Sequence, residues 1–442
     1  MRYPAFRRAA LLRLRADDME LASSQPKHIF DIIVSTINGL GDTDISPGQR
    51  PVIIIDALDE CSLTSTSVAK QRHSVLAALS QWETLSPYFR LIVTSREEPD
   101  ICKTLESSGV FAVHLNTGVG VDQESTADIR VFIKTVLPFA TRDDVESLVE
   151  KAAGLFVWAS TAVQWISAIE GLPQSRLRKL LEHSETEKEH LSSLHSLYHV
   201  ILTDKFGSHP DRDLRRAYQR VMGTILVAVT PFSARSLTHF LSHTRASNPL
   251  AKISKPLAAD VIESVLSRLA VLLRKAPVSE GVDEPVLQFS HQSFPEFLER
   301  ADTKLWFHIH RKDYENQSAL LCLLVLNAGL KFNICHLESS YFPNSHYTDM
   351  TARIRQFFTP SLEYSIKYWV AHLLQVDSVH GFELAPVRLE LSKFLSEHML
   401  HWFEAMSLIG KSRELSSMLR AVIRWLPKVT TRILYFARNL VE

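Results

Sequence analysis

Three acidic side chains follow directly after a short apolar run in the segment PVIIIDALDEC. The run is Val52 to Ile55, and the acids are Asp56, Asp59 and Glu60. A carboxylate at the end of a buried strand can hold Mg²⁺ beside a phosphate group, either directly or through water. A second acid a few residues further on can orient or deprotonate a water molecule. This spacing therefore indicates phosphate chemistry that depends on a metal ion.

The sequence around these acids predicts a strand, a helix and a strand, which is the pattern of an open parallel sheet. Residues 52–55 are apolar and β-branched throughout, which is typical of a central strand buried on both faces. Residues 67–85 have helical spacing, and residues 89–94 form the next apolar run, which Arg96 follows closely. Since ligands bind outside the carboxyl ends of such strands, Asp56 and Arg96 should lie at the same edge.

Two interpretations of these side chains are open at this point. In the first, the acids serve a nucleotide and Arg96 touches its terminal phosphate. In the second, the acids cap the following helix or form an ion pair with Arg96, which is a purely structural role. The combination of an acidic strand end with a neighbouring strand that ends in Thr-Ser-Arg favours the nucleotide interpretation.

VIIIDALDEC resembles the Walker B segment of the NACHT family, within the signal-transduction (STAND) class of P-loop NTPases that includes immune receptors. FRLIVTSREEPDI resembles the sensor strand of large fungal NACHT proteins. The resemblance continues in the same order along nearly the whole chain, through GLFVWASTAVQWI, HLSSLHSLYHVIL, VMGTILVAVTPFSARSLTHFL, VLQFSHQSFPEFL, LKFNICHLESSYF, LEYSIKYWVAHL and MLHWFEAMSLIG.

This resemblance implies a role for each residue of the site. Asp56 would hold Mg²⁺, and Asp59 and Glu60 would assist hydrolysis. Arg96 would sense the terminal phosphate. The cofactors of an intact relative would be Mg²⁺ and ATP or GTP, and nucleotide exchange would shift a closed state towards an open, oligomerising one.

The resemblance also implies a winged-helix region, and with it a role for His291 in FSHQSFPEFL. That histidine would contact bound nucleotide diphosphate, and the alternative is a structural histidine that caps the helix at Ser293. Winged helices often bind DNA, but the candidate recognition helix SARSLTHFLS carries one arginine. Specific DNA binding needs several phosphate contacts, which argues against nucleic acid as a partner.

The phosphate-binding loop of the family is missing from the expected place. Its glycines let backbone N–H groups surround the phosphates, and its lysine neutralises them. Residues 1–50 contain Gly39 and Gly41 but no Lys-Ser or Lys-Thr after them. We expect the chain to begin inside the nucleotide domain and to stop before the C-terminal repeats of its relatives. Losing this grip costs several kcal/mol of phosphate stabilisation, so we expect no hydrolytic turnover by this chain alone.

The predicted fold class is α/β, a partial P-loop NTPase parallel sheet, followed by predominantly α-helical domains that include a winged helix. Residues 259–276 are predicted to form one long amphipathic helix. The predicted domains are a partial NACHT nucleotide-binding domain at 1–145, a helical domain at 146–210, a winged-helix-like domain at 211–300 and a helical C-terminal domain at 301–442.

Composition narrows the function classes further. The 49 basic and 49 acidic side chains give no net charge, and therefore no long-range field for nucleic acid or an anionic membrane. No apolar run reaches the ~18 residues that a membrane span requires. The 4 cysteines are scattered without a CxxC pair, which favours a reducing, cytoplasmic location.

These observations predict a truncated NACHT-type switch scaffold, whose partners are other proteins or further copies of itself. Two alternatives remain. One is a helical interaction scaffold that no longer binds nucleotide, and the other is a magnesium-dependent phosphoesterase that uses the three acids without a P-loop.

Overall fold

The computed structural model is mostly helical, and the residues that it describes include two small sheets of two strands each. The chain divides into two compact units, Met1–His114 and Leu115–Glu442, which are described one at a time. The structure describes Arg8, Leu12, Thr36 and residues 52–60, 72–73, 75–77, 79–80, 90–106, 111–114, 123–168, 172–182, 193–242, 256–277, 284–339, 341–376 and 385–426.

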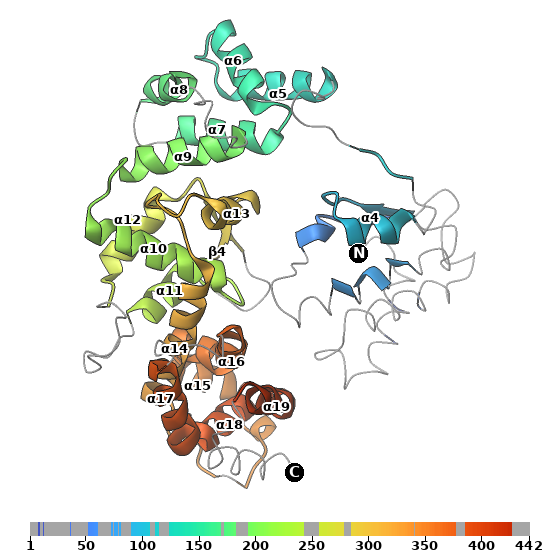
Figure 1. The fold of residues 1–442 in the computed structure, drawn as a ribbon. Helices are drawn as coiled ribbons and strands as arrows, with labels where there is room; N and C mark the ends of the chain where they lie inside the picture. Colours follow the sequence, from blue (N-terminus) through green and yellow to red (C-terminus); the bar gives the residue numbers. More distant parts are fainter. Residues whose placement is uncertain are drawn as a thin grey trace. The chain divides into compact units, whose positions relative to one another are not determined.

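The first unit contains a parallel pair of strands, β1 (Val52–Ile55) and β2 (Arg90–Val93). Val52 lies opposite Arg90, and Ile55 lies opposite Val93. The short 3₁₀ helix η2 (Leu58–Glu60) follows β1, and α4 (Pro99–Glu106) follows β2. Figure 1 draws these elements in blue and cyan. The predicted parallel pairing of the two apolar runs is confirmed.

One face of this sheet is exposed, so the prediction that β1 is buried on both faces is wrong. Val52, Ile54 and Ile92 are 49, 66 and 51 % exposed. The other face packs on a small core. Within the described residues, this core comprises the buried Leu58, Leu76, Leu79 and Ile101 with the partly buried Ile55, Leu91 and Val93. Alternation along each strand therefore sends successive side chains to a covered and an uncovered face.

In the described part of the second unit, the first helices pack around two buried tryptophans, which lie on the third of them. Trp158 and Trp165 are 2 and 0 % exposed, and the indole N–H of Trp158 donates to the carbonyl of Ser193 at 3.1 Å. Both tryptophans therefore belong to the core. The helices are α5 (Gln123–Val136), α6 (Arg142–Ala152), α7 (Phe156–Ser167) and α8 (Pro173–Glu182), followed by α9 (Ser193–Phe206).

The next elements are three helices, an antiparallel strand pair and a short helix. Ser233 caps α11, because its side chain accepts the N–H of Ser236 at 3.1 Å. The elements are α10 (Arg212–Val227), α11 (Ala234–Leu241), α12 (Ala259–Arg268), β3 (Leu273–Ala276), β4 (Val286–Phe289) and α13 (Ser293–Arg300).

The single helix predicted for residues 259–276 is wrong in its second half. The helix α12 ends at Arg268, and residues 273–276 form β3, which pairs with β4. Leu272 and Leu273 are 1 and 5 % exposed in this arrangement. Pairing with a later segment and burial of these leucines outweigh their helical propensity, which is a weak local preference.

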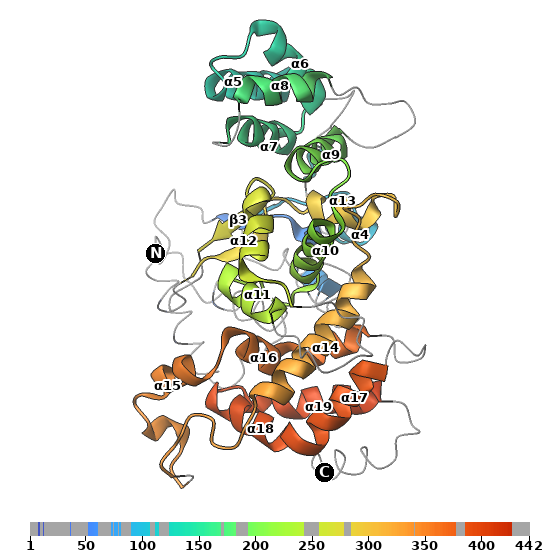
Figure 2. The ribbon, with the colours of Figure 1, turned by 90° about the vertical axis from the view of Figure 1, so that its left-hand side faces the viewer.

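The C-terminal part of the second unit is built around α14 (Arg311–Gly329), which packs on α10, α16 and α17 (Figure 2). Gly223 of α10 lies under the ring of Tyr314, where a Cβ would be 2.3 Å from the ring Cδ1. The other helices are α15 (Met350–Phe357), α16 (Pro360–Gln375), α17 (Ala385–Lys393), a π-helical segment (Phe394–His398), α18 (Met399–Leu408) and α19 (Leu415–Trp425).

Burial is continuous through this unit. Apolar side chains from Ile129 to Val422 form one hydrophobic cluster, and Trp369 and Trp402 are both fully buried within it. The apolar stretch of α14 belongs to this core. Of the helices that the structure describes, none has the length and apolar character needed to cross a membrane.

A buried polar network ties α16 to the end of α10. His372 is 2 % exposed, and its Nε2 shares a hydrogen bond of 2.8 Å with the hydroxyl of Tyr364. That hydroxyl also accepts the backbone N–H of Val229 at 3.1 Å. Burial lowers the pKa of His372 to about 4, because the charged imidazolium would lose its hydration. His372 is therefore neutral in the folded protein at pH 7.

This buried histidine predicts a loss of stability in mild acid. As the pH falls below about 6.5, the unfolded chain takes up the proton while folded His372 resists it until about pH 4. The shift corresponds to about 3 kcal/mol, which is present above pH 6.5 and lost between pH 6.5 and 4. Urea unfolding at several pH values should show this loss in the wild type and its reduction in His372→Gln.

The matched control is His209→Gln, because His209 is exposed on the turn before α10. Its unfolding free energy should follow the wild-type pH dependence. Parallel curves for His372→Gln and the wild type would show that His372 does not carry the effect.

Candidate functional site

The carboxyl ends of β1 and β2 meet at one edge of the first unit. The backbone pairing continues past the strands, since the N–H of Thr94 donates to the carbonyl of Ile55 at 3.0 Å and the N–H of Leu58 donates to the carbonyl of Thr94 at 2.9 Å. These bonds place the segment after β1 against the segment after β2. Asp56 and Arg96, from those two segments, therefore lie at the same edge, as predicted.

Thr94 fixes the turn that carries Asp56. Its hydroxyl donates to Oδ1 of Asp56 at 2.5 Å and accepts the backbone N–H of Ala57 at 2.8 Å. Ala57 has a φ of 52°, a left-handed conformation that a residue with a Cβ adopts only when its surroundings hold it there. Thr94 opens the Thr-Ser-Arg strand end, which by itself assigns no role to its hydroxyl, although a hydroxyl residue directly after a strand is a signal for this kind of contact.

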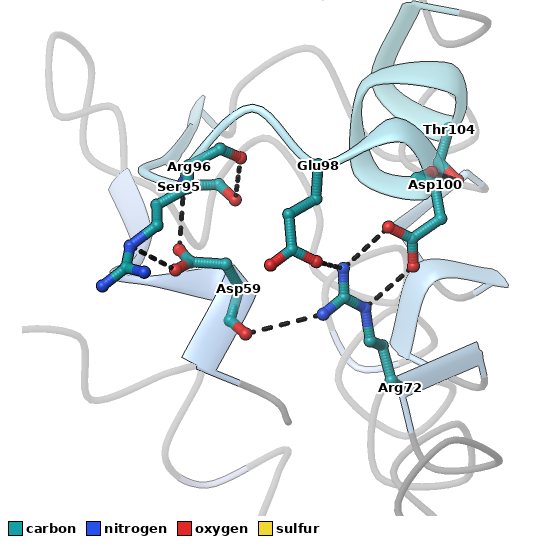
Figure 3. Close-up of polar contacts among 7 residues, drawn as sticks. All are labelled: Asp59, Arg72, Ser95, Arg96, Glu98, Asp100 and Thr104. Carbon is teal, nitrogen blue, oxygen red and sulfur yellow. Dashed lines mark hydrogen bonds and ion pairs between the residues drawn. The ribbon is translucent and has the colours of Figure 1, made fainter. Parts of the chain in front are cut away.

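Asp59 holds Arg96 through both of its oxygens (Figure 3). Its Oδ1 accepts the backbone N–H of Arg96 at 3.0 Å, and its Oδ2 lies 3.3 Å from the Arg96 Nε. The Asp59 side chain is 8 % exposed, whereas that of Arg96 is 46 % exposed. The ion pair considered as the structural alternative is therefore present for Asp59. A carboxylate engaged in this way is poorly placed to take a proton from water.

Arg72 joins the two segments from a third direction. Its guanidinium binds both oxygens of Asp100 at 2.8 and 2.7 Å, pairs with Glu98 and lies 3.5 Å from the carbonyl of Asp59. Figure 3 shows its guanidinium between Asp59 and Asp100. The Arg72 side chain is 2 % exposed. Its sequence signal is its place four and seven residues before two buried leucines, Leu76 and Leu79, on what should be an apolar helical face.

This network also sets the charge states at the edge. Burial alone would lower the pKa of Arg72, but the hydrogen bonds and charges of Asp100 and Glu98 outweigh it and raise that pKa. The hydrogen bond from Arg72 in turn lowers the pKa of Asp100 below its usual value. Both groups therefore stay charged at pH 7, and the ion pair between Arg72 and Asp100 is intact at that pH.

The edge has the donor chemistry for a hydrated magnesium ion. Asp56 is exposed, and Glu60 is exposed nearby on η2. No cluster of three or more His, Cys, Asp or Glu side chains that could hold a metal occurs among the described residues. Mg²⁺ is usually bound by one or two carboxylates, several waters and the phosphates of a substrate, so a site of this kind does not need such a cluster. Asp56 therefore fits the role of a single protein ligand.

His291 lies in the second unit and caps α13. Its Nδ1 accepts the backbone N–H of Ser293 at 3.1 Å and shares a hydrogen bond of 2.6 Å with the Ser293 hydroxyl. The hydroxyl of Tyr198 on α9 bonds the same Ser293 oxygen at 2.8 Å. The capping role considered for this histidine is therefore present. With Nδ1 accepting, the neutral ring carries its proton on Nε2.

The contact between Thr94 and Asp56 gives a testable prediction. Thr94→Val removes the hydroxyl but keeps the shape, so the Ala57 amide loses its acceptor and should exchange its hydrogen faster in the full-length chain. A loss of about 1 kcal/mol in local stability, or roughly fivefold in exchange rate, is expected for one such bond. Thr94→Ser should restore the slow exchange. Equal rates in wild type and Thr94→Val would show that the hydroxyl does not hold the turn.

Comparison of the chain with family models, with curated proteins and with solved structures finds no match. The NACHT resemblance therefore rests on the sequence motifs, and what the chain does must be argued from the geometry of this edge.

Proposed function

We propose that this chain is a NACHT-type nucleotide-dependent switch scaffold, with its nucleotide edge at the carboxyl ends of β1 and β2. The observation that carries the proposal is the parallel register of the two strands, which puts Asp56 and Arg96 at one edge. An acid and an arginine at neighbouring strand ends match the two charges of a magnesium nucleotide, one positive and one negative.

Each side chain of the edge would have its own role in binding the magnesium nucleotide. Asp56, held by Thr94, would bind Mg²⁺, and the ion would neutralise phosphate charge. The partly exposed guanidinium of Arg96 would bind the terminal phosphate of ATP or GTP. Glu60 is exposed and is the better placed of the two remaining acids to orient a water molecule. Asp59, which contacts Arg96, would position that arginine rather than act as a base.

The second unit supports the same proposal through a helix and strand order typical of a winged helix. The helices α10 to α12 precede the β3–β4 pair, in which Leu273 lies opposite Phe289. His291 follows β4 directly, and its Nδ1 contacts the backbone N–H and the hydroxyl of Ser293 at the start of α13. Arg235 on α11 lies 3.5 Å from Glu284, so the one arginine of this helix is partly neutralised and DNA is a poor ligand for it.

We expect nucleotide binding without turnover. Catalysis of phosphoryl transfer depends on charge stabilisation by a lysine and a cradle of backbone amides, and the sequence GxxxxGK[ST] does not occur in residues 1–50. One missing contact of this type costs about 10²- to 10³-fold in rate. Binding of a magnesium nucleotide, which needs fewer contacts, would then serve to bias one conformation over another.

A helical interaction scaffold without nucleotide is the second candidate. The observation that favours it is the contact between Asp59 and Arg96, because each satisfies the other's charge without any ligand. In that case the edge would be a structural ion-pair network. The helices of the second unit, held together by their large continuous core, would then present a fixed surface to protein partners or to other copies of the chain.

Titration of the purified chain with fluorescent ATP, GTP and ADP, with Mg²⁺ or with EDTA, tests these candidates. Asp56→Asn should weaken binding about tenfold with Mg²⁺ present, equivalent to ~1.4 kcal/mol, and should change nothing in EDTA. The matched control is Asp128→Asn, which removes an exposed carboxylate on α5 and should bind like the wild type.

The other outcomes separate the alternatives. If the wild type binds no nucleotide under any condition, the scaffold is the better description. Magnesium-dependent turnover of a phosphoester that Asp56→Asn abolishes would instead identify a phosphoesterase. Binding that is the same in wild type and Asp56→Asn with Mg²⁺ present would remove Asp56 from the site.

A further inference from the structure

The loop between β2 and α4 carries Arg96 and is anchored on both sides. On one side, Asp59 accepts the backbone N–H of Arg96 and contacts its Nε. On the other side, Glu98 and Asp100 bind Arg72. A loop of this length would otherwise sample many conformations, and each anchor removes part of that freedom. The position of the Arg96 guanidinium is therefore set by side chains outside the loop.

Arg72 contacts the residues on both sides of this loop. It reaches the carbonyl of Asp59 on η2 and the carboxylates of Glu98 and Asp100 at the start of α4. Its contact with Asp100 is a two-bond fork, which fixes orientation as well as distance. The guanidinium thus links η2 to the start of α4, and Arg96 lies on the loop that precedes α4.

A purely stabilising ion pair would not need this geometry. An acid such as Asp100 in the first turn of α4 is already favoured by the helix dipole. Covering the arginine to 2 % exposure removes hydration from its charge, which opposes the pairing. The arrangement is better explained when the arginine also fixes the distance between the Asp59 backbone and the loop, because a lysine could not form the two-bond fork with Asp100 and an apolar residue has no donor at all.

We propose that Arg72 is the positioning residue that sets Arg96 for recognition of a terminal phosphate. The choice of ligand, a magnesium nucleoside triphosphate over the diphosphate, rests on the proposed function. The positioning itself rests on the contacts of Arg72 with Asp59, Glu98 and Asp100. Arg72 acts through Arg96 and does not touch the ligand.

Arg72→Lys tests this inference, because lysine keeps the charge and most of the length but cannot form the fork. The first measurement is amide hydrogen exchange in the full-length chain. The Arg96 amide, which donates to Asp59, should exchange about tenfold faster, while the Thr94 amide, which donates to Ile55, should stay as protected as in the wild type. This measurement needs no nucleotide.

The second measurement is the ratio of the dissociation constants for MgADP and MgATP. A merely structural role would weaken both ligands alike. A positioning role predicts that Arg72→Lys weakens MgATP about tenfold, leaves MgADP unchanged and so removes the preference for the triphosphate. Arg130→Lys is the matched control, because Arg130 makes the same two-bond contact with Glu146 on α5 and α6. It should change neither measurement.

Asp100→Asn removes the charge that Arg72 pairs with, and this variant replaces Arg72→Lys if Arg72→Lys does not fold. It should raise exchange at Arg96 in the same way. Unchanged exchange at Arg96 in the folded variant would overturn the inference, as would equal losses of MgATP and MgADP. A wild type that binds no nucleotide would contradict the proposed function and the ligand choice, while the exchange result would still decide whether Arg72 positions Arg96.

Discussion

The backbone pairing of two short parallel strands is the constraint on which the candidate site depends. It continues one step past the strands, where the N–H of Leu58 reaches the carbonyl of Thr94. That last bond closes the turn over Ala57 and brings η2 against the loop after β2. Every polar contact at the edge, from Thr94 with Asp56 to Asp59 with Arg96, builds on this short backbone ladder. The charges alone could not create the arrangement, because ion pairs with exposed members such as Arg96 and Asp100 contribute little free energy by themselves.

The strand positions and the shared edge could be predicted from the sequence, since an apolar β-branched run followed by acids has few other structures. The division of labour among the acids could not. Asp56 and Asp59 are the same residue type three positions apart, yet one accepts a hydroxyl and the other holds an arginine. That difference depends on the left-handed turn at Ala57 and on Thr94, which only the folded chain brings together. The partners of Arg72 could not be predicted either, because they are distant in the sequence and only the folded chain brings them together.

In the second unit, local signals worked where a helix begins with its own cap, as Ser233 does for α11. They failed where a distant partner decides the conformation. The segment after Arg268 has helical spacing, but its leucines are buried by pairing with β4, which comes more than ten residues later in the chain. Its backbone bonds are non-local, and no window of sequence around that segment contains them.

The absence of a side chain at Gly223 has a mechanical consequence. With the Tyr314 ring seated on its backbone, α10 and α14 meet at closer range than helices separated by ordinary side chains. Tyr314 cannot slide along α10 without striking the Cβ atoms on either side of the glycine. The same α14 packs on α16 and α17 further along its length. A rotation of α10 would therefore be passed to α14 through the Tyr314 ring, and from α14 to the helices that pack on it.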